Sequence, residues 1–228
     1  MQLTPEDIQA IRLSLQVGIV ATACSLVPGF AVAWVLAFRE FRGKALLEVL
    51  VSLPLTLPPV VIGFLLLLLL GRNGWAAPLL NTLGIQLIFT WKAAVIASAT
   101  VGFPLLVRSI RLGMESIDPS LIQAAQTLGA PWHDRLLTVV LPLSMRGILA
   151  GSSLMFARSL GEFGATIIVA GNIPGLTQTI PLAIYDYAAS PASTSMALSL
   201  CLVSVAISVV VLFLHENLAS RLAGRRQR

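Results

Sequence analysis

Five long apolar runs, separated by short polar segments, constrain the fold of this chain more than any other feature. They lie at residues 13–38, 48–70, 87–107, 147–170 and 194–215. Each is long enough for a membrane-spanning helix, which needs about twenty mainly apolar residues. Only 11% of the 228 residues are charged, and the mean hydropathy is +0.89, which excludes an ordinary soluble domain. We predict an all-α integral membrane protein with about five transmembrane helices. A sixth arises if Pro28-Gly29 divides the first run.

The positive charges indicate how these helices cross the membrane. Loops on the cytoplasmic side are rich in Lys and Arg, and three basic clusters follow the first, third and fifth runs: Arg39, Arg42 and Lys44; Arg108, Arg111, Arg135 and Arg146; and Arg221, Arg225, Arg226 and Arg228. The other side carries chiefly Arg12, Arg72 and Lys92. We therefore expect the N-terminus outside and the C-terminus in the cytoplasm. The basic residues lack interleaved aromatic residues, so nucleic acid is not an expected partner.

These features divide the chain into three parts. Residues 1–12, with Pro5, Glu6 and Asp7, are expected to lie along the outer interface as a short amphipathic segment. Residues 13–215 form one membrane domain, with a long cytoplasmic loop at 108–146. Residues 216–228 form a basic cytoplasmic tail.

A polar interruption at residues 117–129 predicts a short helix with defined ends. Asp118 is suited to the N-cap, Pro119 to the first helical position, and Gly129 to the left-handed turn after the last one. About ten residues cannot span a membrane. Small residues beside apolar ones allow a groove of another protein to approach the backbone closely, so we interpret this helix as a docking element.

The same stretch resembles the signature of binding-protein-dependent ABC importer permeases. That signature runs Glu-Ala-Ala, three residues, Gly, nine residues and Ile-x-Leu-Pro, and marks their cytoplasmic coupling loop. Here Gln123 replaces the Glu and Val139 replaces the Ile; the Gln keeps length and hydrogen bonding but loses a charge. The resemblance implies that an ATPase subunit contacts Leu121, Ile122, Gln123, Ala124, Ala125, Leu128, Gly129, Leu141 and Pro142.

The sequence offers no catalytic centre of its own. A phosphate-binding loop ends in Gly-Lys-Ser or Gly-Lys-Thr, yet the two lysines, Lys44 and Lys92, are each followed by Ala. Cys24 and Cys201 lie within apolar runs, where we expect neither a disulfide nor a metal site. We predict a transport subunit that is not an enzyme and binds no cofactor, with ATP hydrolysed by a partner subunit.

Two ionisable residues lie deep in the fourth apolar run. Arg158 and Glu162 are one helical turn apart, and such groups usually face a protein interior or a water-filled cavity. They either pair with each other or contribute to a translocation pathway or gate. Gly161 and Gly164 flank Glu162 and, with Ser159, form a stretch in which the helix is expected to break.

Prolines mark a second irregular site, in the second apolar run. Pro54, Pro58 and Pro59 remove backbone donors and disturb a helix. The freed carbonyls, together with Thr56, could line a pathway. The alternative is a packing kink without substrate contact.

Three stretches narrow the family resemblance to its molybdate and sulfate branch. Residues 53–63, residues 158–166, and residues 171–175 with 177–181 are similar to segments of molybdate permeases. The resemblance implies a type I ABC importer permease fold in a bacterial inner membrane, and import of molybdate by alternating access. It also implies three kinds of partner: a second copy of the chain, two cytoplasmic ATP-binding subunits, and an extracytoplasmic oxyanion-binding protein. A sulfate, thiosulfate or tungstate permease is the nearest alternative, and a membrane scaffold without transport a remote one.

Overall fold

The computed structural model describes residues 3–190 and 193–224, and helices are the regular elements found there. The long helices are α1 (Pro5–Phe38), α5 (Trp91–Glu115), α9 (Met145–Leu160) and α12 (Thr194–Gly224). The shorter ones are α2 (Lys44–Thr56), α3 (Pro59–Leu70), α4 (Ala77–Thr82), α6 (Pro119–Thr127), α7 (Trp132–Arg135), α8 (Leu141–Leu143), α10 (Gly164–Val169) and α11 (Ile180–Ala188). A π-helical turn, Leu136–Val140, joins α7 to α8.

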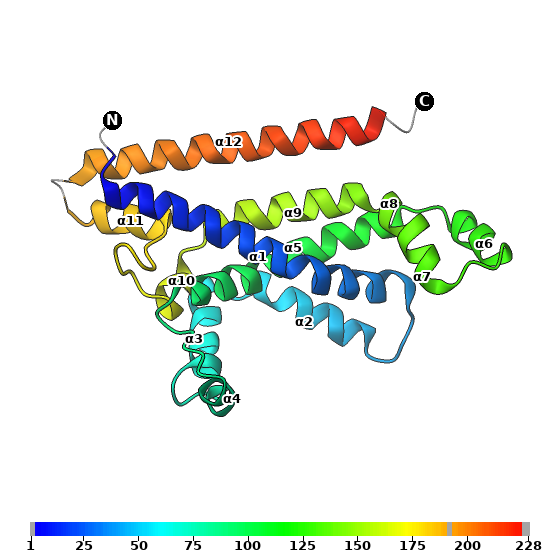
Figure 1. Cartoon of the computed structure of the whole chain (residues 1–228), viewed down its shortest axis with the longest axis horizontal. Coiled ribbons are helices and arrows are strands. Elements are labelled where there is room, and N and C mark those ends of the chain that lie inside the picture. The colour runs from blue at the N-terminus through cyan, green and yellow to red at the C-terminus, as the bar shows by residue number, and fades with distance from the viewer. Residues whose placement is uncertain (1–2, 191–192, 225–228) are drawn as a thin grey trace.

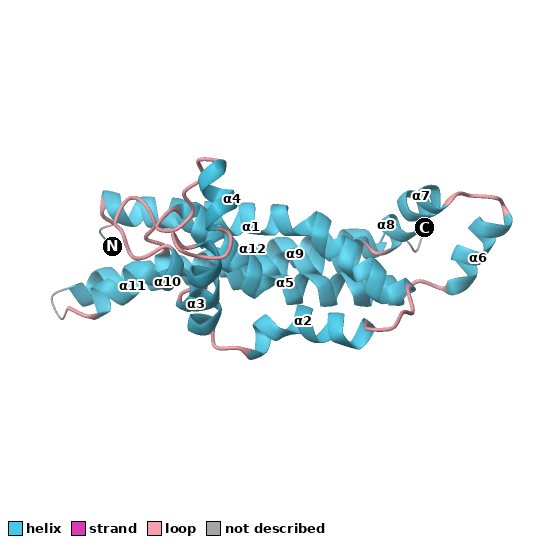
Figure 2. Ribbon diagram, turned by 90° about the horizontal axis from the view of Figure 1, so that it is seen from below, coloured by secondary structure: helices cyan, strands magenta, loops and turns pink. Residues whose placement is uncertain are grey.

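The long helices run side by side as an elongated bundle (Figure 1). At one end of the bundle lie α3, α4, α10 and α11, whereas α6 and α7 project beyond the other end (Figures 1 and 2). The chain enters at the first end with α1, and α12 finishes at the second end. The chain therefore traverses the bundle an odd number of times.

The first apolar run forms one helix, not two. Helix α1 continues from Pro5 to Phe38 through Pro28, so the structure gives no support to the six-helix alternative. Its start is fixed by a capping box: the Thr4 hydroxyl accepts from the Asp7 N–H, and Asp7 accepts from the Thr4 N–H. We expected a boundary between an interfacial segment and the membrane domain after residue 12, but α1 continues through it without a break. The interfacial position of residues 1–12 stays a prediction.

The second apolar run is sharply bent. We expected one span over 48–70, but α2 and α3 meet at 113°. The residue before a proline avoids the α-helical region, and both Leu57 and Pro58 precede one. Their ψ angles of 143° and 133° are extended accordingly.

The fourth apolar run is also interrupted, as the glycines predicted. Helix α9 ends at Leu160 and α10 begins at Gly164, which leaves Glu162 between them. In the described part of the chain, three helices are long and apolar enough to cross a membrane, or up to five if each bent pair is one span. One bent pair is α2 with α3; the other is Trp132–Leu143 with Met145–Leu160, bent by 65°, so the span expected at 147–170 shares only α9 with it.

The central packing joins α1, α5 and α9 through small residues. Gly113 and Gly147 lie so close that a Cβ on either would come within 2.9 Å of the other's Cα. Buried Ala21, Ala94 and Ala97 belong to the same apolar core. Close backbone approach through small residues is how helices associate where lipid removes the hydrophobic drive between them.

The basic tail lies partly outside the described residues. Helix α12 continues to Gly224, whereas Arg225, Arg226 and Arg228 are not described. Two short helices, α4 and α11, were not predicted, because turn-forming residues dominate the sequence around them.

Candidate coupling and gating sites

The coupling segment, residues 116–144, connects α5 to α9 at one end of the bundle. It is shorter than the loop expected at 108–146, because α5 continues to Glu115 and places Arg108 and Arg111 on a helix. Their apolar neighbours Val107, Ile110 and Met114 are buried, so one face of α5 stays packed beyond the apolar run.

Both predicted ends of the short helix are present. The Asp118 carboxylate accepts a 2.9 Å hydrogen bond from the Ser120 N–H, and Pro119 is the first residue of α6. That backbone hydrogen bond holds the pKa of Asp118 below its usual value. The cap is therefore charged at neutral pH, and its contribution to the helix is lost only as the pH falls through that lowered pKa. Gly129 has φ +79° and ends the helix in the left-handed region.

The coupling segment presents apolar side chains to solvent. Leu128 is 87% exposed and Leu121 47% exposed, and the exposed Trp132 and Leu137 continue this surface onto α7 and the π-helical turn. Ile122 differs, because it packs against the core of the bundle. Gln123, Ala124, Gly129 and Pro142 are exposed, whereas Ala125 and Leu141 are half-buried. Of the predicted coupling residues, Ile122 therefore anchors the helix to the bundle.

The π-helical turn is a feature that sequence reasoning missed. Pro142 has no N–H to donate to Thr138, and its ring would clash with that carbonyl in a regular α-helix. The wider turn over Leu136–Val140 relieves this clash. The Leu-Pro pair at 141–142 was the signal that could have indicated it.

The two irregular sites of the sequence are brought together at the opposite end of the bundle. Residues 53–63 contain the bend before α3, and residues 158–166 contain the break before α10. We call these two stretches, which meet where α3 packs against α10, the bend cluster. A Cβ on Gly63 would lie 2.8 Å from the Ala165 carbonyl oxygen, and one on Gly164 would lie 3.0 Å from the Pro59 Cβ. The glycines therefore permit the close approach of these two short helices.

Glu162 is the buried charge of the bend cluster. Its side chain is 1% exposed and forms a 2.8 Å ion pair with Arg158, whose side chain is 31% exposed. The other carboxylate oxygen accepts a 2.8 Å hydrogen bond from the Ala165 N–H, one of the free donors at the start of α10. The predicted pairing with Arg158 is confirmed. Glu162 thus holds together the break between α9 and α10.

The remaining candidates have simpler surroundings. The Thr56 hydroxyl donates to the Leu53 carbonyl at 2.9 Å within α2. Pro54 is half-buried and Pro58 is exposed. The Ser159 Oγ is buried and has no hydrogen-bond partner among the described residues, whereas a Cβ on Gly161 would meet only the Arg158 carbonyl oxygen, at 4.0 Å.

A polar scaffold behind the bend cluster was not predicted. The Ile180 N–H donates to the Ser14 hydroxyl at 2.8 Å, and the Tyr187 hydroxyl donates to Asp7 at 3.0 Å. Both bonds join α11 to α1 across more than 160 residues of sequence. Pairings at such separation leave no local signal in a single sequence.

Comparison with known proteins identifies the family. The family model described as "binding-protein-dependent transport system inner membrane component" matches residues 29–224. The molybdenum transport system permease protein ModB of Haemophilus influenzae is 50% identical, with 95% of each chain covered. The Escherichia coli K12 protein of that name is 48% identical, with 96% of each covered. The sulfate transport system permease protein CysW of Synechococcus elongatus is 38% identical, covering 96% of this chain and 76% of that one.

The solved structures agree on the fold. The structure of a bacterial alginate ABC transporter in complex with alginate pentasaccharide-bound periplasmic protein aligns with a TM-score of 0.76 at 16% identity. It covers 96% of this chain and 80% of that one. The fold is thus that of ABC importer permeases, and the chain belongs to the family of inner membrane components of binding-protein-dependent transport systems.

Proposed function

We propose that this chain is the membrane-spanning permease subunit of an ATP-driven molybdate importer. The observation that carries the proposal is the coupling segment: a capped helix, too short to cross a membrane, that presents apolar side chains beyond the end of the bundle. An exposed apolar surface on a protruding segment favours a protein partner. The family supplies the kind of partner, an ATP-binding subunit.

The ATP-binding subunit would contact the outer face of α6. Leu121 and Leu128 would enter an apolar groove, and the small side chain of Ala124 would let the groove reach the backbone. Gln123, also exposed, would offer a hydrogen bond in place of the charge of the usual Glu. Two such subunits would act on two copies of this chain, which has no phosphate-binding loop of its own.

The bend cluster is the candidate gate. It combines three features that support this role: two interrupted helices, a buried ion pair and a glycine-mediated contact between α3 and α10. Interrupted helices are typical of transport pathways. Alternating access would then be a rearrangement of this contact, driven from the coupling segment. An extracytoplasmic binding protein would deliver the anion to the loops at the same end of the bundle.

Molybdate is favoured over sulfate by sequence similarity. The chain is 50% identical to a molybdenum permease and 38% identical to a sulfate permease at nearly equal coverage of this chain. A weakly charged pathway suits either anion, because a tight site would slow its release. Selectivity would therefore reside largely in the binding protein.

The test is cellular molybdenum content, measured by elemental mass spectrometry. A deletion strain and its complemented counterpart are grown with trace molybdate and abundant sulfate. We expect a loss of molybdenum on deletion and its recovery on complementation. Unchanged molybdenum together with defective sulfate assimilation would instead assign the chain to sulfate import.

A further inference from the structure

Helix α2 is held to the bundle in an unusual way. In the part of the chain that the structure describes, none of the thirteen residues of α2 is fully buried. Leu47 and Val51 are partly buried and pack against the core. By contrast, α5 beside it buries twelve residues. A helix with so little buried surface depends strongly on its specific contacts for its position.

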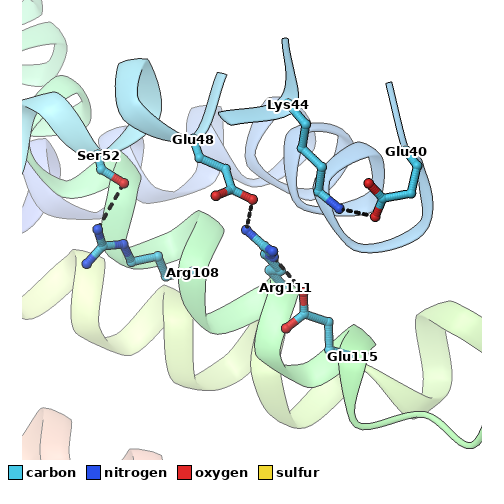
Figure 3. A network of polar contacts seen from close by, with 7 residues as sticks. All are labelled: Glu40, Lys44, Glu48, Ser52, Arg108, Arg111 and Glu115. Atoms are coloured by element: carbon cyan, nitrogen blue, oxygen red, sulfur yellow. Dashed lines mark hydrogen bonds and ion pairs between the residues drawn. The ribbon is translucent and has the colours of Figure 1, made fainter. Parts of the chain in front are cut away.

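Two polar contacts tie α2 to α5. Arg111 is their centre: its Nη1 lies 2.7 Å from the Glu48 carboxylate on α2, and its Nε lies 2.6 Å from the Glu115 carboxylate on α5 (Figure 3). One turn earlier on α5, the Arg108 Nη2 donates to the Ser52 hydroxyl at 2.9 Å. We call Glu48, Ser52, Arg108, Arg111 and Glu115 the α2–α5 clasp.

The clasp lies between the coupling segment and the bend cluster. Glu115 is the last residue of α5, and the cap of α6, Asp118, follows three residues later. On the other side, α2 continues into the 113° bend and then α3, which packs against α10 at Gly63 and Gly164. A displacement of the end of α5 thus reaches the bend cluster through α2, provided that the clasp holds.

We propose that Arg111 is the positioning residue that makes α2 move with the coupling segment, and so couples ATP hydrolysis to the opening of the bend cluster. An arginine suits this role because its planar guanidinium binds two carboxylates at once with fixed geometry. Hydrogen-bonded ion pairs can also hold two helices together without the tight interdigitation of a packed core. This inference rests on the proposed function, since it concerns how that transport is driven.

The chain offers a matched control for this ion pair. Lys44 on α2 forms a 2.6 Å ion pair with Glu40, four residues earlier, but this pair does not reach α5 (Figure 3). Lys44→Gln removes one positive charge and one ion pair close to the clasp. It leaves the link between α2 and α5 intact.

The experiment measures molybdate transported per ATP hydrolysed in proteoliposomes that contain the whole transporter with its binding protein. The variants are Arg111→Gln, Glu48→Gln and Lys44→Gln. Ion pairs with this degree of exposure are weak, so we expect Arg111→Gln and Glu48→Gln to lower the ratio by about two- to fivefold. Lys44→Gln should leave the ratio unchanged.

Each outcome decides the inference. An unchanged ratio in both Arg111→Gln and Glu48→Gln would overturn it, as would an equal loss in Lys44→Gln. If Arg111→Gln does not assemble, Glu48→Gln tests the same contact and leaves the Arg111–Glu115 pair in place. Absence of molybdate transport by the unaltered transporter would refute the proposed function instead.

Discussion

At the scale of single residues, glycines serve two different purposes in this chain. Gly129 has φ +79° and open space around it, so only its backbone conformation requires glycine. Gly63 and Gly164 have ordinary φ angles but lie against a neighbouring helix. The sequence alone predicted the first purpose from the position of Gly129 after a short helix. The sequence did not reveal that Gly63 and Gly164 both lie in the contact between α3 and α10.

Gly129→Val is expected to uncouple ATP hydrolysis from transport. A side chain in the left-handed region costs about 1–2 kcal/mol, and a β-branched one resists it further, so the end of α6 would be displaced. We expect normal membrane insertion but strongly reduced molybdate uptake. Gly84→Val is the matched control, because Gly84 also has a positive φ, +64°, and open space, but follows α4, which lies at the opposite end of the bundle. Normal uptake by the Gly129 variant would contradict the coupling role of this turn.

Glu162→Ala is expected to destabilise the transporter more than Glu162→Gln. The alanine leaves the buried Ala165 N–H without its acceptor and Arg158 without its partner. Loss of a hydrogen bond to a charged group costs about 1.5–3 kcal/mol, whereas the glutamine retains an acceptor oxygen. The check is the thermal unfolding midpoint of the purified protein in detergent. Equal midpoints for the two variants would show that the hydrogen bond to the Ala165 N–H does not stabilise the break.

At the scale of elements, the sequence indicated where helices are interrupted but not what the interruptions do. Pro58-Pro59 and Gly161 to Gly164 were both recognised as irregular. The 113° angle between α2 and α3 was not predictable, since proline excludes the straight helix but leaves the direction of the next one to its packing partners. That partner is α10, from the second interruption.

Gly63→Ala is expected to weaken the contact between α3 and α10. The added Cβ would meet the Ala165 carbonyl oxygen at 2.8 Å, a backbone atom that cannot move alone. Overpacking of this kind costs about 1–3 kcal/mol, so the unfolding midpoint and the transport rate should both fall. Gly161→Ala is the control for the unfolding midpoint, because its Cβ would meet nothing closer than 4.0 Å and its φ is −92°. A similar loss in both variants would argue against the contact.

At the scale of the whole molecule, charge is distributed along the bundle axis. The loop between α1 and α2, the end of α5, the coupling segment and the adjoining starts of α2 and α9 lie at one end (Figure 1). They carry seven of the twelve described Lys and Arg residues: Arg39, Arg42, Lys44, Arg108, Arg111, Arg135 and Arg146. Arg12, Arg72 and Lys92 lie toward the other end. This asymmetry favours the coupling segment in the cytoplasm.

Single-cysteine labelling tests this orientation. In a background with Cys24→Ser and Cys201→Ser, we expect Lys92→Cys to react with a membrane-impermeant thiol reagent in intact spheroplasts. Gln126→Cys, on the coupling segment but outside the proposed groove contact, should react only after the membrane is opened. Both side chains are exposed in this chain, so accessibility across the membrane decides the result. The reverse pattern would invert the topology.

The sequence by itself determined the class of fold, the number and place of the apolar spans, and both ends of the coupling helix. These depend on hydropathy, proline, glycine and capping side chains, whose effects extend over one helix or less. The tertiary structure alone decided which of these local features meet. It placed Gly63 against Ala165, tied Arg111 to Glu48 and joined α11 to α1. Such contacts depend on the packing of distant segments, for which a single sequence carries no local signal.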